Sequence, residues 1–229
     1  MSIAKGDFIR VSYTGKTADD GHVFDTTDED VAKANKIYNE KGKYGGDVII
    51  AGSGHTVAGL DEDLMGKDVG YKGSVTIPPE KAFGVRNPEL IESIPINRFK
   101  DRPQVGMPVE IDGRPGMIIR VIGRMVQVDF NRFLAGQTVI YDYEIKEKLE
   151  DNESKVKGLI ALYTGKELPV KVNDGELTVE LEPEMTYNQR WLMTKRQIAH
   201  ELIENTDIRE VLYLERYNKK ILEPKAAGQ

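Results

Sequence analysis

Apolar and polar residues alternate along several short segments in the first third of the chain. Asp7 to Tyr13 and Asp68 to Ile77 alternate in this way, which predicts strands, and Asp47 to Ala51 is a short apolar run of strand length. Val57 to Met65 has helical spacing over one or two turns and stops before a glycine. Asp28 to Gly46 is polar and is expected to be a loop. The pattern therefore predicts a sheet with one short helix.

A long strand is predicted much later, at Gly136 to Leu149. Its alternate positions place Val139, Tyr141 and Tyr143 on one face and Ile140, Asp142 and Glu144 on the other. We expect this strand to complete the sheet that begins before Gly84. Residues 88–130 are then an insertion, because they interrupt a sheet that is finished only after them.

The insertion has a strand pattern of its own. Val109 to Asp112, Gly116 to Gly123 and Met125 to Phe130 are separated by turn residues, which predicts a three-strand meander. Most of its apolar positions repeat with a period of two, but Ile118 and Ile122 fall on the opposite face. A unit this small cannot easily bury both faces, so the pattern favours an exposed apolar groove.

Methionine is unusually frequent in the insertion. Met107, Met117 and Met125 lie there, out of 7 methionines in the chain. Flexible, polarisable side chains suit a surface that accepts varied apolar partners. Each of them is equally compatible with filling gaps in a small core.

The last part of the chain predicts a small α+β unit. Strands are expected at Val156 to Tyr163, Leu168 to Val172, Glu176 to Leu181 and Asp207 to Tyr217, with a hairpin turn at Asn173 to Gly175 and an amphipathic helix from Thr186 to Asn205. Trp191 is expected in the core. So small a unit also gains by burying surface against a second copy, which suggests a homodimer through a sheet edge or the helix face.

Composition limits the class of protein. With 229 residues and 39% hydrophobic residues, the chain suffices for one to two packed domains. The N-terminal residues lack the apolar run of a signal peptide and no stretch has the length of a membrane span, so a cytoplasmic location is expected. The chain has 0 cysteines, which excludes disulfides and thiol chemistry, and its 3 histidines are far apart. We therefore expect no metal and no cofactor.

Charge is unevenly distributed. The net charge is -6, yet residues 88–130 and residues 154–229 each carry equal numbers of basic and acidic side chains. The acidic excess thus lies in residues 1–87 and 131–153. Nucleic-acid-binding proteins usually carry a basic stripe, so polypeptide is the expected partner rather than nucleic acid.

Four segments carry the most specific signal. VTIPPEKAFG, from Val75 to Gly84, joins a strand end to two prolines, a turn and an aromatic residue. VSYTG, DGHVFDTT and GSGHTVAGLDEDLMG precede it. In this order they resemble the FKBP family of peptidyl-prolyl isomerases. An insertion after Phe83 that returns through Asn131 to Gly136 is typical of the SlyD-like branch, and the C-terminal unit in place of a histidine-rich tail is similar to the archaeal long-chain FKBPs.

The resemblance implies a fold and a division into domains. The fold is α+β, with an FKBP-type antiparallel half-barrel around a short helix. Residues 1–87 plus 131–153 form the isomerase domain, residues 88–130 form a small β-rich domain inserted in the flap, and residues 154–229 form a C-terminal α+β domain.

The resemblance also implies a rotamase that turns X-Pro bonds in unfolded or partly folded polypeptides. Its prolyl pocket would be walled by Tyr13, Phe24, Asp25, Val57, Phe83 and Tyr141, with Leu60 at the floor. Two positions depart from the common pattern. The floor is often tryptophan, and Phe83 replaces a tyrosine and so lacks its hydroxyl.

The insert is the expected site of chaperone activity. Its candidate residues for binding unfolded apolar polypeptide are Ile96, Phe99, Val105, Met107, Met117, Ile119, Met125 and Val126. One alternative is a non-catalytic holdase with a vestigial pocket, which Leu60 and Phe83 encourage. Another is that the insert is only a rigid lid over the pocket.

Three consecutive carboxylates offer a different chemistry. Asp61, Glu62 and Asp63 could serve a hydrolase as general acid and base. Acidic residues at the start of a helix also complement the helix dipole, and this simpler interpretation is preferred.

Overall fold

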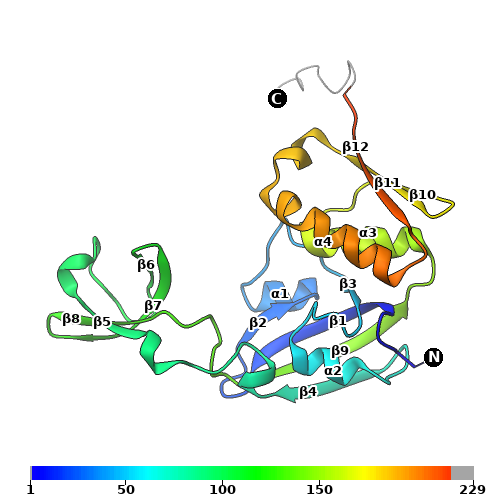
Figure 1. The fold of residues 1–229 in the computed structure, drawn as a ribbon. Coiled ribbons are helices and arrows are strands. Elements are labelled where there is room, and N and C mark those ends of the chain that lie inside the picture. Colours follow the sequence, from blue (N-terminus) through cyan, green and yellow to red (C-terminus); the bar gives the residue numbers. More distant parts are fainter. Residues whose placement is uncertain (1, 218–229) are drawn as a thin grey trace.

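The computed structural model describes residues 2–217 of the chain. Within them the strands form three sheets, and the strands of the second sheet are inserted between β4 (Lys72–Ile77) and β9 (Val139–Lys148) of the first (Figure 1). The expected α+β class is confirmed, with an antiparallel first sheet, an inserted β-rich unit and a C-terminal α+β unit. Residue 1 and residues 218–229, which belong to the predicted first and third domains, lie outside the described residues.

The first sheet is interrupted by the insert. It consists of β1 (Phe8–Thr17), β2 (Val23–Thr26), β3 (Asp47–Ile50), β4 (Lys72–Ile77) and β9 (Val139–Lys148). The order is β2-β1-β9-β4, with β3 also paired to β1, and every pairing is antiparallel. The long strand predicted after the insert is therefore confirmed as β9, which completes the sheet between β1 and β4.

A short helix covers the inner face of this sheet. In α2 (Ala58–Leu64), Leu60 and Leu64 lie one turn apart and are fully buried against the sheet residues Ile9, Ile49 and Ile77. Burial of this apolar stripe, rather than the propensity of seven residues, stabilises so short a helix.

The polar segment Asp28 to Gly46 is not entirely loop. It contains α1 (Glu29–Ala34), which begins at Asp28, whose side chain accepts the N–H of Val31 at 2.9 Å. Single-turn 3-10 helices lie at η1 (Pro79–Lys81), η2 (Pro88–Leu90) and η3 (Ile96–Arg98), and η4 (Pro183–Tyr187) is slightly longer. Three of them begin at a proline, which fits the first helical position.

The insert is a sheet with its own core. Its strands are β5 (Ile91–Pro95), β6 (Pro108–Ile111), β7 (Arg114–Ile122) and β8 (Met125–Asp129), in the order β5-β8-β7-β6. The predicted meander is confirmed as β6-β7-β8, whereas β5 was missed. Proline residues lie close to both ends of β5, and it forms the edge of the sheet, where proline is tolerated.

The C-terminal unit contains one helix that the sequence pattern did not predict. Its elements are α3 (Asn152–Thr164), β10 (Val170–Asn173), β11 (Glu176–Leu181), α4 (Gln189–Asn205) and β12 (Glu210–Glu215). β10 and β11 form the predicted hairpin, and β12 lies parallel to β11 after the crossover through α4.

The strand predicted at Val156 to Tyr163 is wrong, because these residues lie within α3. Asp151 caps the helix by accepting the N–H of Ser154 at 2.8 Å, and Gly165 ends it in the left-handed conformation at φ 74°. The helix is buried on several sides, so its apolar run lacks the one-sided spacing by which an amphipathic helix is recognised.

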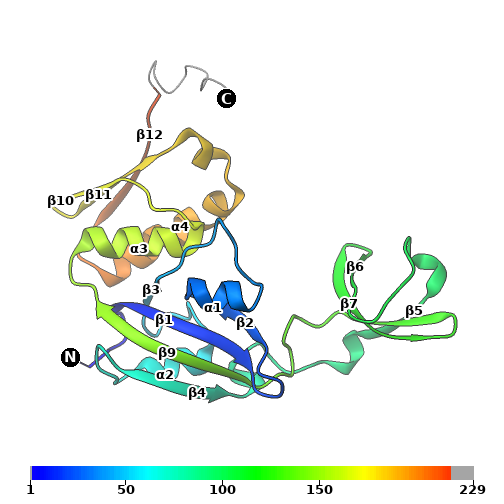
Figure 2. The same ribbon diagram turned by 180° about the vertical axis from the view of Figure 1, so that it is seen from behind.

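The C-terminal unit shares a core with the first sheet. Val48 and Ile50 of β3 belong to the same buried cluster as Leu159, Ile160 and Trp191. Figure 2 shows α3 and α4 between the first sheet and the C-terminal strands. A Cβ at Gly158 of α3 would lie 2.5 Å from the Cβ of Val48, so only glycine permits this close approach.

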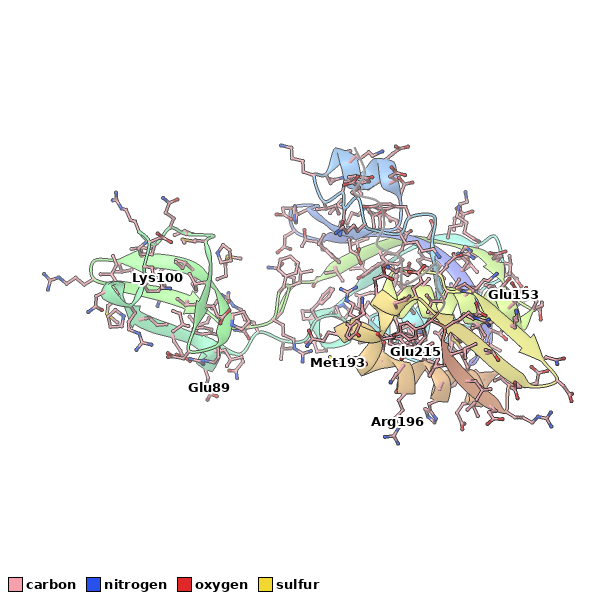
Figure 3. All side chains as sticks on the ribbon, turned by 90° about the horizontal axis from the view of Figure 1, so that it is seen from above. Glu89, Lys100, Glu153, Met193, Arg196 and Glu215 are labelled. Atoms are coloured by element: carbon pink, nitrogen blue, oxygen red, sulfur yellow. The ribbon has the colours of Figure 1, made fainter. Side chains whose placement is uncertain are left out.

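The insert stands apart from the other two units. Figure 3 shows the insert, marked by Glu89 and Lys100, joined to the rest of the chain by two thin segments, while α4, marked by Met193 and Arg196, belongs to the opposite body. The two segments are held together at the base of the insert. Arg86 binds Asp129 through Nε at 2.9 Å, and the N–H of Asn87 donates to Oδ1 of Asn131 at 2.7 Å.

None of the helices within residues 2–217 combines the length and apolarity that crossing a membrane requires.

Candidate active site

A pocket of about 580 Å³ opens between the first sheet and α2. All seven residues predicted for the prolyl site line it: Tyr13 from β1, Phe24 and Asp25 from β2, Val57 and Leu60 at the start of α2, Phe83 after η1, and Tyr141 from β9. Tyr13 and Tyr141, the first and last of these residues, are 128 positions apart in the sequence. The structure therefore brings the predicted set together in one cavity.

Aromatic rings form the wall of the pocket. The ring of Phe24 lies edge-on to Phe83 at 5.5 Å and to Tyr141 at 5.8 Å between centroids. Tyr13 contacts Tyr141 at 5.7 Å. Edge-to-face pairs of this kind contribute about 0.5–1.5 kcal/mol each beyond the burial of their area. The rings therefore fix one another and give the cavity a defined apolar shape.

Gly15 makes room for the central ring of this wall. A Cβ at Gly15 would lie 2.7 Å from Cζ of Phe24 and 3.0 Å from Cε1 of Tyr141. Gly15 faces Asp25 across the β1-β2 ladder, so the ring of Phe24 folds back over the neighbouring strand. The missing side chain on β1 thus determines where the ring of Phe24 lies.

The floor of the pocket and one hydrogen-bond donor come from the start of α2. Leu60 is 0% exposed and closes the cavity from below. The carbonyl of Val57 accepts the N–H groups of Leu60 and Asp61, both at 3.0 Å. Within residues 2–217, by contrast, the N–H of Val57 has no hydrogen-bond acceptor. A backbone donor is thereby left available in a residue that lines the pocket.

Tyr13 lies between two carboxylates. Its hydroxyl is 3.1 Å from Oδ2 of Asp25 and 3.2 Å from Oδ2 of Asp47. Burial raises the pKa of Tyr13 far above its usual value, and the two carboxylate charges raise it further, so the hydroxyl stays protonated. Burial likewise raises the pKa of Asp47. Burial also raises the pKa of Tyr141, with a smaller contribution from the charge of Asp25.

The sequence pattern missed several residues of the site. Asp47 appeared only as the polar start of an apolar strand, although its charge beside Val48 to Ile50 was a usable signal. His55, Thr56, Ala58, Ala82, Phe133 and Leu134 also line the pocket. Phe133 and Leu134 come from the segment that returns from the insert, and this position next to the flap was the available signal.

The three consecutive carboxylates have separate structural partners. Asp61 accepts the N–H groups of Gly52 and Gly54 at 2.8 and 2.9 Å. Glu62 forms an ion pair with Lys81, and Asp63 accepts the hydroxyl of Tyr143. They do not converge on one reacting position, as an acid-base pair requires. Within residues 2–217, no group of three or more histidine, aspartate and glutamate side chains is arranged to hold a metal ion.

The candidate residues of the insert divide by exposure. Ile96, Val105, Met117 and Met125 are exposed, and Val105 is the most exposed of them at 67%. Phe99 and Met107 are partly buried against the small core, and Val126 lies inside it at 0% exposure. Val126 therefore does not present its side chain to a partner in this conformation.

An irregularity in β7 explains part of this division. The pairing of β7 with β8 shifts between Ile118 and Arg120, so Ile119 has no partner there and is only partly buried. Ile118 is buried, whereas Met117, Val121 and Ile122 of the same strand are exposed. The apolar excess of the insert thus lies largely on its surface.

A second hollow lies at the base of the insert. It has a volume of about 500 Å³, and its lining includes Leu90, Met117, Phe130 and Phe133. Phe133 is 68% exposed and also lines the first pocket. One side chain therefore borders both cavities.

Models of known families match three successive parts of the chain. The model described as FKBP-type peptidyl-prolyl cis-trans isomerase matches residues 1–98, the model "FKBP26, IF domain" matches residues 92–134, and the model "FKBP26_C-terminal" matches residues 152–218.

Curated relatives agree with these matches. A short-type peptidyl-prolyl cis-trans isomerase of Methanocaldococcus jannaschii is 40% identical over 148 residues, which cover 63% of this chain and 93% of the relative. The FKBP-type 16 kDa peptidyl-prolyl cis-trans isomerase of Escherichia coli K12 is 40% identical over 39% of this chain and 64% of its own length. The isomerase SlyD of Aeromonas hydrophila is 32% identical over 64% of this chain and 65% of its own length.

Proposed function

The chain belongs to the FKBP-type family of peptidyl-prolyl cis-trans isomerases, and we propose that it couples this isomerase activity to the capture of unfolded polypeptide by its insert. As an enzyme of this family it acts on polypeptide and rotates X-Pro bonds. The coupling, and the role of each side chain in the pocket, go further than family membership. Both rest on the geometry of the two cavities.

The reaction needs no nucleophile. Rotation about an amide bond is opposed by about 18–20 kcal/mol because resonance gives the C–N bond double-bond character. The planar amide is more charge-separated than the twisted one, so an apolar pocket disfavours the ground state more than the transition state. The wall of Phe24, Phe83 and Tyr141 above Leu60 supplies such surroundings for the proline ring.

Polar groups at the rim hold the substrate in register. The unpaired N–H of Val57 can donate to a substrate carbonyl and so fix one side of the rotating bond. The hydroxyl of Tyr13 is directed to Asp25 and Asp47, so these groups keep the aromatic wall aligned. Phe83 has no hydroxyl to bind the substrate. Orientation of the substrate then depends on the N–H of Val57 and on the aromatic wall that Tyr13 keeps aligned through its contacts with the two carboxylates.

The observation that carries the coupling is the position of Phe133. This exposed ring borders both the hollow at the base of the insert and the prolyl pocket. A polypeptide bound in the hollow beside Met117 and Leu90 would therefore lie next to the catalytic site. Tethering of this kind raises the effective concentration of its prolines at the pocket without requiring tight binding there.

The two alternatives for the insert and pocket have less support. A vestigial pocket would not require all seven predicted residues to meet in one cavity with a free backbone donor. A rigid lid would require the insert sheet to cover the pocket, yet residues 91–129 contribute nothing to its lining, and only Phe133 and Leu134 approach it from that side.

Separate variants distinguish capture from turnover. Asp25→Ala and Phe83→Ala are expected to abolish turnover of a proline-containing tetrapeptide but to leave suppression of protein aggregation intact. Met117→Ser, which changes an exposed side chain that lines the hollow, is expected to do the reverse. Equal loss of both activities in every variant would contradict two separable sites, and no tetrapeptide turnover by the intact chain would contradict an active pocket.

The C-terminal unit supports a second, independent proposal of a homodimer. Leu192, Met193 and Ile203 of α4 and Leu212 and Leu214 of β12 are exposed apolar side chains. Contact with a second copy would bury them. Light scattering of the intact chain at high concentration is expected to give twice the monomer mass, and a monodisperse monomer would exclude the dimer.

A further inference from the structure

The loop Gly52 to Val57 connects β3 to α2 and contributes to the prolyl pocket. His55, Thr56 and Val57 all line the cavity, and Val57 carries the unpaired N–H described above. No strand pairs with this loop within residues 2–217. Among the described residues, its backbone hydrogen bonds lie only at its two ends, where Ser53 donates to Ile50 at 3.2 Å and the carbonyl of Val57 accepts from the first turn of α2. Side chains supply the other contacts that hold the loop.

His55 is the side chain of this loop that reaches into the neighbouring unit. Its side chain is only 5% exposed. Its Nδ1 accepts the N–H of Ile50 at 3.1 Å, so in the neutral ring Nε2 carries the proton. Nε2 lies 3.1 Å from Oε2 of Glu201, which belongs to α4 of the C-terminal unit. His55 thus donates a hydrogen bond to a carboxylate of the C-terminal unit, 146 positions away in the sequence.

Glu201 is itself held by its own unit. The hydroxyl of Tyr163 on α3 and the amide of Gln197 both donate to its Oε1 at 2.7 Å. The ring of Tyr163 also contacts the ring of His55 edge-on at 5.8 Å. Glu201 is 7% exposed and receives three donors, so the carboxylate is a fixed acceptor rather than a mobile surface charge.

A second side chain holds the same loop from the unit of the first sheet. Asp61 of α2 accepts the N–H groups of Gly52 and Gly54, at the beginning of the same loop. Asp61 fixes where the loop leaves β3, whereas the Glu201 hydrogen bond fixes the end of the loop that carries Val57. The two carboxylates come from different units of the chain.

We propose that Glu201 is a positioning residue for the isomerase site, which acts through its hydrogen bond to His55 to hold the loop that carries the N–H of Val57. The C-terminal unit then completes the geometry of the catalytic pocket rather than serving only as an appendage. This inference rests on the prolyl pocket proposed above. It assigns Glu201 no contact with the substrate.

The test uses the full-length chain and NMR-measured isomerisation of a proline-containing tetrapeptide. Glu201→Ala is expected to lower kcat by about fivefold with little change in KM, because the apolar wall that binds proline is untouched while the donor is misplaced. Activity is expressed per folded molecule, with the folded fraction measured by circular dichroism. The amide signal of Val57 is expected to shift or broaden in the variant.

Glu201→Gln provides a second variant at the same buried position. Its side-chain oxygen can still accept from Nε2 of His55, so kcat and the Val57 amide signal are expected to remain close to those of the intact chain. Glu167→Gln is the matched control, because it weakens a different contact between the first sheet's unit and the C-terminal unit, the ion pair from Lys43 to Glu167 at 2.6 Å, which is not part of the pocket loop. It is expected to leave kcat unchanged.

A double-mutant cycle separates positioning from simple stabilisation. If Glu201 acts through His55, Glu201→Ala added to His55→Ala is expected to change kcat by less than about twofold. Wild-type kcat in folded Glu201→Ala, or the same loss with and without His55, would overturn the proposal. The failure of the pocket assignment is distinct: Asp25→Ala and Phe83→Ala would then retain full turnover whatever Glu201 does.

Discussion

Substitution of Gly15 by alanine changes the prolyl pocket without altering any residue that lines it. The new Cβ would lie 2.7 Å from Cζ and 2.8 Å from Cε2 of Phe24. Non-bonded carbon atoms in proteins do not approach one another this closely. The ring of Phe24 must therefore move, and its edge contacts with Phe83 at 5.5 Å and Tyr141 at 5.8 Å must change with it.

The magnitude follows from these contacts. Overpacking of a filled site costs about 1–3 kcal/mol of stability. Displacement of the Phe24 ring from two edge-to-face pairs removes about 1–2 kcal/mol of interaction energy between the pocket rings. If the transition state loses the same stabilisation, kcat/KM falls about tenfold. We therefore expect Gly15→Ala to remain folded, to unfold at lower denaturant concentration, and to isomerise a tetrapeptide about tenfold more slowly.

Gly116→Ala is the matched control for this prediction. A Cβ at Gly116 would lie 2.7 Å from Cγ1 of Val128, so the clash is of the same size but falls within the insert. Its tetrapeptide kcat/KM is expected to match that of the unmodified chain despite a similar loss of stability. Unchanged activity in Gly15→Ala, or equal losses in both variants, would show that the position of the Phe24 ring does not matter for catalysis.

Three further substitutions test other contacts of the site. Asp61→Asn is expected to lower the free energy of unfolding by about 1–3 kcal/mol, since one of the two loop N–H groups loses its acceptor, and urea unfolding measures it. Asp47→Asn is expected to stabilise the protein more at pH 7 than at pH 4. The pKa of Asp47 is raised in the folded state, so the folded protein binds this proton more tightly than the unfolded chain does. Ionised Asp47 therefore destabilises the folded state as pH rises, and this destabilisation disappears as pH falls through the folded pKa. A pH-independent difference would contradict this. Phe83→Tyr restores a donor at the pocket and is expected to strengthen binding of a proline peptide by about 1 kcal/mol, which calorimetric titration would detect.

The residues of the cavity proposed as the prolyl site were largely predictable from the sequence because they lie in short segments with specific motifs. Tyr13, Phe24, Val57 and Phe83 each lie in one of the four segments on which the resemblance rests, and the structure gathers them as expected. The long strand β9 was predictable for a local reason as well, since alternation over its length places Tyr141 on the inner face.

Residues that depend on distant contacts were not predictable. Asp47 joins the site only because β3 pairs with β1 and brings it to Tyr13. His55 gains its role from Glu201, which lies 146 positions away on α4. Neither residue has a local motif, because what matters is the partner that folding places beside it.

Local patterns also failed where an element is buried on several sides or irregular. The apolar run in α3 resembles a strand because the helix contacts the first sheet on one side and α4 and β10 on others. In the insert, the irregularity near Ile119 changes which residues of β7 face the core, so simple alternation placed Ile118 on the wrong side.

Proline-limited refolding of an unfolded protein, compared between the intact chain and a chain with residues 88–130 replaced by a short turn, tests the coupling of capture to isomerisation. Tetrapeptide turnover by both chains serves as the reference for an intact pocket. We predict that both turn over the tetrapeptide, while acceleration of refolding falls sharply in the shortened chain. Equal acceleration of refolding by the two chains would contradict the coupling, because the pocket would then need no help from the insert.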